Sequence, residues 1–167
     1  MSIHDFQAKT VDGEEVSLSR YRGKALLVVD AASRCGYTPP YQGLEERYEA
    51  CQARGFEVLA FPCKDFGAQE PGTNEEIREF CELRCRVALP PFAKIPARGR
   101  DAHPLYRHLA SLPEHGGEVT WNFNKFVVDT RGTVVAHLDS GVASGSPALR
   151  EILERLLPAK PDGGARP

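Results

Sequence analysis

Cys35 is the residue of this chain whose surroundings most favour chemistry. It lies within LLVVDAASRCGYTPPYQGL, residues 26–44, where the apolar run 26–29 predicts a buried strand and the segment from Tyr41 onward predicts a helix. The cysteine falls in the connection between these elements, where a helix N-terminus can favour a thiolate. A dithiol redox protein would carry a second cysteine three positions later, but that position is Thr38. The stretch therefore predicts a single reactive thiol, with a small buried apolar cysteine as the alternative interpretation.

The other four cysteines have less distinctive positions. Cys51 lies on the apolar stripe of the helix predicted after Cys35, and Cys63 follows a predicted strand, so packing is the simplest interpretation of both, with a secondary redox role open for Cys63. Cys81 and Cys85 form a Cys-x₃-Cys pair on or just past one predicted helix. A zinc site would need two more ligands at suitable spacing, and the five histidines are scattered. We predict no metal and no cofactor.

Three polar or aromatic side chains in predicted loops have ordinary interpretations when each is taken alone. Trp121 is the only tryptophan and would serve as an aromatic plug of a small core. Its neighbour Asn122 is a typical turn residue, and Gln69 lies in a loop flanked by glycine and proline, where it would be solvated.

The composition excludes several classes of protein. The 167 residues carry a net charge of −2, which offers no basic stripe for nucleic acid or an anionic membrane. No apolar stretch approaches the ~20 residues that span a bilayer, so we expect no membrane insertion. The N-terminal MSIHDFQAKT lacks the pattern of a secretory signal, and five cysteines are too few for a disulfide scaffold, so we expect a reducing, cytoplasmic setting.

The hydrophobic pattern predicts alternating strands and helices. Strands are expected over 25–29 and 56–62, with a helix over about 40–54 between them that stops at Gly55, and a hairpin is expected within 6–24 around Asp-Gly. Thr73 and Glu76 match a capping box that would begin a second helix. A short helix over 103–112, a hairpin over 123–138 and a final helix beginning at Ser146-Pro147 complete the chain.

This order of elements is that of an α/β protein with a thioredoxin-like fold. We expect a central mixed β-sheet flanked by helices, with an N-terminal hairpin, in which the first βαβ unit forms a parallel pair and the later hairpin an antiparallel edge. Residues 1–157 are predicted to form a single domain, and 158–167 a disordered tail.

Four motifs, in order and in register, resemble the glutathione peroxidase family: ASRCGYTPPYQGLE, FPCKDFGAQEPGTNEEIREFC, AHPLY and WNFNKF. The resemblance extends from about Phe6 to Leu157. It implies that Cys35 is the peroxidatic cysteine and that Gln69, Trp121 and Asn122 complete the catalytic tetrad. The residue types suit the reaction, because amide and indole N–H groups can stabilise the thiolate and the oxygen that departs when the O–O bond breaks.

Attack on a hydroperoxide leaves a sulfenic acid on Cys35, which another thiol must resolve. The resemblance places that thiol at Cys81, as in the two-cysteine members of the family that are usually reduced by thioredoxin, with Cys85 as the rival. Joining Cys35 to Cys81 requires their Cα atoms to come within about 7 Å, so we expect local unwinding of the Cys81 helix. The connection between AHPLY and WNF is short, which in the family goes with a monomer that accepts bulky lipid hydroperoxides.

The resemblance thus implies a thiol-dependent peroxidase that reduces hydrogen peroxide and organic or lipid hydroperoxides. A redox sensor or relay that oxidises a partner protein is the alternative, as is a glutathione-dependent peroxidase; a metal-binding domain is a third class. The chain departs from the family pattern at Asp30, at Lys64-Asp65 and at Arg98-Gly99. None of these positions belongs to the tetrad, but they bear on loop electrostatics and docking of the reductant.

Overall fold

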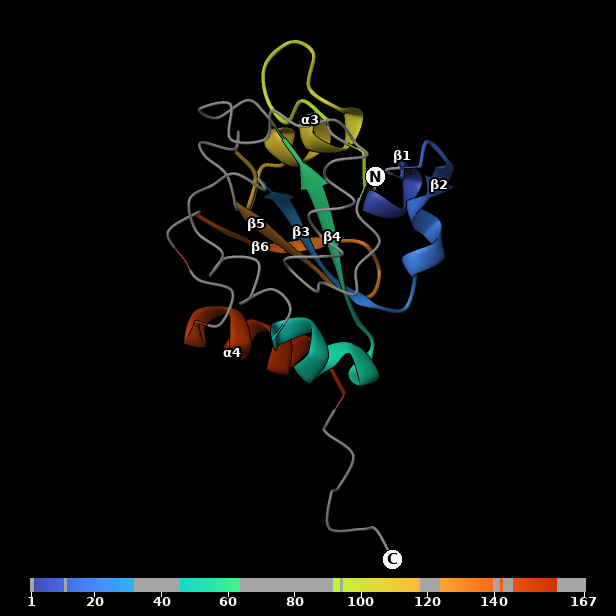
Figure 1. Cartoon of the computed structure of the whole chain (residues 1–167). Coiled ribbons are helices and arrows are strands. Elements are labelled where there is room, and N and C mark those ends of the chain that lie inside the picture. Colours follow the sequence, from blue (N-terminus) through green and yellow to red (C-terminus); the bar gives the residue numbers. More distant parts are fainter. Residues whose placement is uncertain are drawn as a thin grey trace, which may run out of the picture.

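A four-stranded mixed sheet forms the centre of the protein in the computed structural model (Figure 1). The structure describes residues 2–10, 12–31, 46–63, 92–93, 95–117, 124–139, 142 and 146–158. The strand order is β4-β3-β5-β6, with bounds β3 Ala25–Ala31, β4 Phe56–Pro62, β5 Lys125–Val128 and β6 Val134–Leu138. β3 and β4 are parallel, whereas β3 with β5 and β5 with β6 are antiparallel. The predicted parallel pair and antiparallel hairpin are both confirmed.

Alternate residues of β3 face two separate apolar layers. Leu26 and Val28 pack in a cluster that includes residues of helix α3, Pro104–Ser111, and of the N-terminal segment. Leu27 and Val29 pack in the opposite cluster with residues of helix α4, Pro147–Leu156, and of the helix at 46–51. Figure 1 shows α3 and α4 on opposite sides of the sheet. Because both faces are covered, the strand is a continuous apolar run instead of an alternating one.

Capping side chains mark the starts of α3 and α4, and a glycine marks the end of a short 3₁₀ helix. The His103 side chain caps α3 by accepting a hydrogen bond from the Leu105 N–H, and Ser146 does the same for α4 through the Leu149 N–H. The short 3₁₀ helix η3, Gln52–Arg54, follows the helix at 46–51 and ends at Gly55, whose φ of 87° is a left-handed conformation that favours glycine. The predicted start near residue 40 and the helix after Thr73 lie outside the described residues.

The predicted N-terminal hairpin consists of β1, Gln7–Lys9, and β2, Glu15–Ser17, which pair antiparallel. Short 3₁₀ helices flank it, η1 at Ile3–Asp5 and η2 at Leu18–Tyr21. The Ala93 N–H donates a hydrogen bond to the Lys9 carbonyl at 2.8 Å, which connects the hairpin to the rest of the protein. Among the described residues, no helix is long and apolar enough to cross a membrane.

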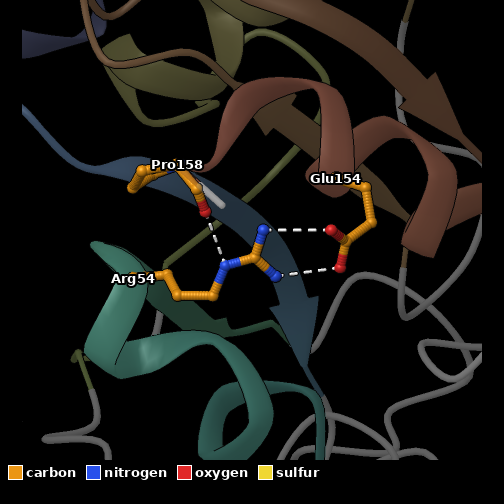
Figure 2. Close-up of polar contacts among 3 residues, drawn as sticks. All are labelled: Arg54, Glu154 and Pro158. Atoms are coloured by element: carbon orange, nitrogen blue, oxygen red, sulfur yellow. Dashed lines mark hydrogen bonds and ion pairs between the residues drawn. The ribbon is translucent and has the colours of Figure 1, made fainter. Parts of the chain in front are cut away.

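Arg54, the last residue of η3, contacts the C-terminal end of α4 and the chain just after it (Figure 2). Its guanidinium donates to both carboxylate oxygens of Glu154, at 2.9 and 3.0 Å, and its Nε donates to the Pro158 carbonyl at 2.8 Å. The Arg54 side chain is 3 % exposed and that of Glu154 48 %. The planar guanidinium suits this bidentate geometry, so the contact fixes α4 against the chain that precedes β4.

Replacing Arg54 by methionine should lower the free energy of unfolding by about 2 kcal/mol, because three charge-assisted hydrogen bonds of a buried side chain are lost. Urea denaturation measures the effect. Lys24→Met is the matched control, since the Lys24–Glu57 pair is a single 3.1 Å contact with a Lys24 side chain 44 % exposed. Exposed pairs of this kind contribute less than about 1 kcal/mol. Equal losses in the two variants would contradict the role assigned to Arg54.

Candidate active site

The carboxyl ends of β3 and β4 and the start of β5 lie at the same end of the sheet. Ala31 pairs with Pro62 at the carboxyl ends of the parallel strands β3 and β4, and Val29 pairs with Lys125 at the start of β5. Figure 1 shows the arrowheads of β3 and β4 at the same end of the sheet. We call this end, defined by Asp30, Ala31, Pro62 and Lys125, the catalytic edge.

The predicted site residues belong to the segments that leave or enter the catalytic edge. Cys35 follows the end of β3 by four positions, and Gln69 follows the end of β4 by seven. Trp121 and Asn122 precede the start of β5 by four and three positions. These four residues and Cys81 lie outside the described residues. The described strands therefore fix where the connecting segments begin and end, and they lead them to a common edge.

Buried charged and amide groups are concentrated at this edge. Asp30 is 0 % exposed, Lys125 2 % and Asn124 0 %, although the surrounding sheet is apolar. Burial lowers the pKa of Lys125 to about 8, against the opposing attraction of the Asp30 carboxylate, which favours the ammonium form. Burying two charges is costly, and such groups are typical of functional sites.

Tyr106, on α3, lies on the α3 side of the sheet and adds a further buried polar group. Its side chain is buried against Phe61 and Phe126 in edge-to-face ring contacts, and its hydroxyl has no hydrogen-bond partner in the described part of the chain. Burial raises the Tyr106 pKa well above its usual value, and the negative charges of Asp30 and Cys63 act in the same direction. Tyr106 therefore stays a neutral phenol across the physiological range.

A second polar contact lies at the start of β5. Nε2 of His137, on β6, lies 3.1 Å from the Asn124 side-chain oxygen, and its ring stacks on Phe126 with centroids 4.1 Å apart. The other ring nitrogen lies 3.4 Å from the Gly116 carbonyl. The sequence pattern did not single out Lys125, Asn124 or His137, which lie at or next to the catalytic edge. Their one signal was the presence of polar side chains inside an otherwise apolar hairpin.

The two cysteines that the structure describes are both buried, as their positions predicted. Cys51 is 3 % exposed within the α4-side cluster, and Cys63 is 0 % exposed within the α3-side cluster. Packing therefore accounts for both positions. Across the described ranges, no group of three or more histidine, cysteine, aspartate or glutamate side chains is arranged to hold a metal ion.

The described architecture, a mixed sheet between two helical layers preceded by an N-terminal hairpin, defines a thioredoxin-like fold, as predicted. The crystal structure of T. cruzi GPX1 has a TM-score of 0.72 to this protein and is 31 % identical, covering 93 % of this chain and 94 % of its own. The family model for glutathione peroxidase matches residues 3–110.

Sequence relatives lead to the same assignment. A glutathione peroxidase of Lactococcus lactis subsp. cremoris is 44 % identical over 137 residues, which cover 81 % of this chain and 87 % of the relative. The hydroperoxy fatty acid reductase gpx1 of Synechocystis is 46 % identical over 147 residues, covering 83 % and 87 %. This chain belongs to the glutathione peroxidase family.

Replacing Lys125 by methionine should destabilise the protein by about 3 kcal/mol at pH 7, because the buried Asp30 carboxylate loses a compensating positive charge. The double variant Asp30→Asn/Lys125→Met should recover most of this loss, since it removes both charges together. A double-mutant cycle by urea denaturation measures the coupling. Additive effects of the two single changes would show that the pair does not interact.

The same pair gives stability a pH dependence with a definite sign. The folded-state pKa of Lys125, about 8, is below its ordinary value of 10.5, so between these pH values the unfolded chain binds more protons. The free energy of unfolding of the wild-type protein should therefore rise from pH 8 to 10 relative to that of Asp30→Asn/Lys125→Met. Parallel pH profiles of the two proteins would contradict the lowered Lys125 pKa.

Proposed function

We propose that this protein is a thiol peroxidase that reduces hydrogen peroxide and organic or lipid hydroperoxides through Cys35. The observation that carries the proposal is the convergence of three strand ends at the catalytic edge, in a chain that belongs to the glutathione peroxidase family. Each of those strands connects directly to a segment bearing a member of the tetrad Cys35, Gln69, Trp121 and Asn122.

In the first step the Cys35 thiolate attacks one oxygen of the hydroperoxide. The S–O bond forms as the O–O bond breaks, and the departing oxygen takes up the proton that the Cys35 thiol released and leaves as an alcohol or water. The amides of Gln69 and Asn122 and the indole N–H of Trp121 donate hydrogen bonds to the developing negative charge. Cys35 is left as a sulfenic acid, oxidised by two electrons.

In the second step the Cys81 thiol attacks the Cys35 sulfur and releases water, which forms a disulfide. A dithiol protein of the thioredoxin type then supplies two electrons and restores both thiols. This reductant fits a reducing cytoplasm, where such dithiols are maintained. Glutathione is the less favoured reductant, because an anionic tripeptide calls for a basic surface and the chain has a net charge of −2.

The proposed substrate class and oligomeric state rest on the short connection before Trp121, which in the family goes with a monomer that accepts bulky lipid hydroperoxides. Only 14 residues separate Tyr106 from Trp121, which leaves little chain to build a subunit interface beside the site. We therefore propose a monomer whose open surface admits bulky hydroperoxides. The hydroperoxy fatty acid reductase of Synechocystis, 46 % identical, supports a lipid hydroperoxide as one substrate.

Replacing Cys35 by serine should abolish hydroperoxide turnover, because the hydroxyl is a far weaker nucleophile than a thiolate at neutral pH. Cys81→Ser should stop multiple turnover and let Cys35 proceed to sulfinic acid, while the matched change Cys85→Ser should leave turnover intact. Peptide mapping by mass spectrometry after one equivalent of hydroperoxide should find a Cys35–Cys81 disulfide. A Cys35–Cys85 disulfide would reassign the resolving thiol, and activity retained by Cys35→Ser would overturn the proposal.

The reductant is tested with the wild-type enzyme. Turnover should be supported by thioredoxin with its reductase and should be much slower with glutathione alone at equal thiol concentration. Coupled oxidation of NADPH measures both rates. Faster turnover with glutathione would reverse the assignment. A stable mixed disulfide with one partner protein, without turnover by either reductant, would favour a redox relay.

A further inference from the structure

The segment that carries Trp121 and Asn122 is bounded by two described anchors. Gly117 precedes it in the turn after α3, and Asn124 follows it at the start of β5. Only six residues, 118–123, connect them. Whatever holds these two anchors therefore limits where the two proposed hydrogen-bond donors can be placed.

The first anchor is a closely packed turn at the C-terminal end of α3. The Gly117 N–H donates to the Ala110 carbonyl at 3.2 Å, and a Cβ atom at Gly116 would collide with the Leu112 carbonyl. His115 adopts a φ of 58°, a left-handed conformation uncommon for a residue with a side chain. The turn thus brings the backbone so close to α3 that the Gly116 carbonyl has a fixed direction.

The second anchor is the fully buried Asn124, directly before β5. Both anchors contact the same side chain, His137 of β6. Its Nδ1 lies 3.4 Å from the Gly116 carbonyl oxygen, and its Nε2 lies 3.1 Å from the Asn124 side-chain oxygen. A Cβ atom at Gly117 would also touch the His137 ring, at 3.7 Å. One imidazole therefore bridges the two ends of the donor segment.

The His137 ring is itself held in place. It lies flat on Phe126, its partner in the β5–β6 register, with an interplanar angle of 16°. A carbonyl oxygen only accepts, so Nδ1 must carry a proton to bond Gly116. Nε2 then donates to the Asn124 oxygen in the imidazolium, or, in the neutral ring, accepts from the Asn124 NH₂ group with the side-chain amide turned over. The ring can serve both anchors in either protonation state.

We propose that His137 is a positioning residue of the peroxidase site, which clamps the two ends of the segment bearing Trp121 and Asn122. This inference rests on the proposed function, since it concerns the donors that would stabilise the departing oxygen. Donors act without reorganisation only if they are held in advance, and small misplacement of such groups is costly to the rate. His137 does not touch the substrate; it acts through the backbone of the donor segment.

The test uses His137→Phe, which keeps a flat ring on Phe126 but removes both nitrogens. Because Trp121 is the only tryptophan, its fluorescence reports directly on the segment. Quenching by acrylamide should increase in the folded variant at 25 °C. The rate constant for oxidation of reduced enzyme by hydroperoxide, measured by stopped flow, should fall about tenfold. The rate of re-reduction by thioredoxin should be unchanged, because that step does not need the donors.

Two further variants make the result specific. His108→Phe, on α3, is the matched control: its ring lies against Phe6 of the N-terminal segment, and it should resemble the wild type in both measurements. His137→Gln keeps one amide, which can hydrogen-bond one anchor, and should lie between His137→Phe and the wild type. Thermal unfolding of each variant identifies any loss that comes from the fold as a whole.

The clamp would be overturned if His137→Phe showed the same acrylamide quenching and the same oxidation rate constant as the wild type. It would also be overturned if His108→Phe changed both quantities as much as His137→Phe does. A lower unfolding midpoint with unchanged quenching would also overturn it, because it would assign His137 to general stability. Absence of peroxidase activity in the wild-type protein would instead overturn the proposed function. The quenching comparison would then still decide whether His137 restrains the segment.

Discussion

The pairing of β3 with its two neighbours is the constraint on which the proposed site depends. Residues 25–30 are all fully buried, with β4 parallel on one side and β5 antiparallel on the other. A slip of one residue would exchange the two faces of the strand and place Asp30 among the apolar side chains packed on α4. The burial pattern therefore fixes the register, and the register brings the segments that follow β3 and β4 and precede β5 to one edge.

The polar groups whose burial costs free energy are concentrated at the catalytic edge. Most of the sheet is apolar, but Asp30, Asn124 and Lys125 are withdrawn from water at the catalytic edge, with Tyr106 beneath. In such a low-dielectric setting fixed charges and dipoles act more strongly than in water. Reactions that develop negative charge on oxygen benefit from surroundings of this kind, which gives the energetic cost a functional reason.

Two polar side chains join separate elements of the frame, Arg54 next to the opposite end of β4 and His137 on β6 near the catalytic edge. Arg54 connects η3, which follows the helix at 46–51, to the end of α4, and His137 connects the turn after α3 to the start of β5. Each contacts two separate partners: those of Arg54 lie 100 and 104 positions after it in the sequence, and those of His137 lie 21 and 13 positions before it. Directional contacts of this sort add geometric definition that apolar packing alone does not supply.

Local patterns in the sequence determined the elements: the apolar runs predicted β3 and β4, and Ser146-Pro147 predicted the start of α4. The position of Cys35 between a predicted strand and a predicted helix indicated a reactive thiol, and motif resemblance singled out its proposed partners. Only the tertiary structure showed that β3 continues through Asp30 to Ala31, that Lys125 is buried at the start of the neighbouring strand β5, and that His137 contacts Asn124. Their environments are set by cross-strand neighbours, and no pattern confined to one segment encodes which strand lies beside it or how deeply the pair is buried.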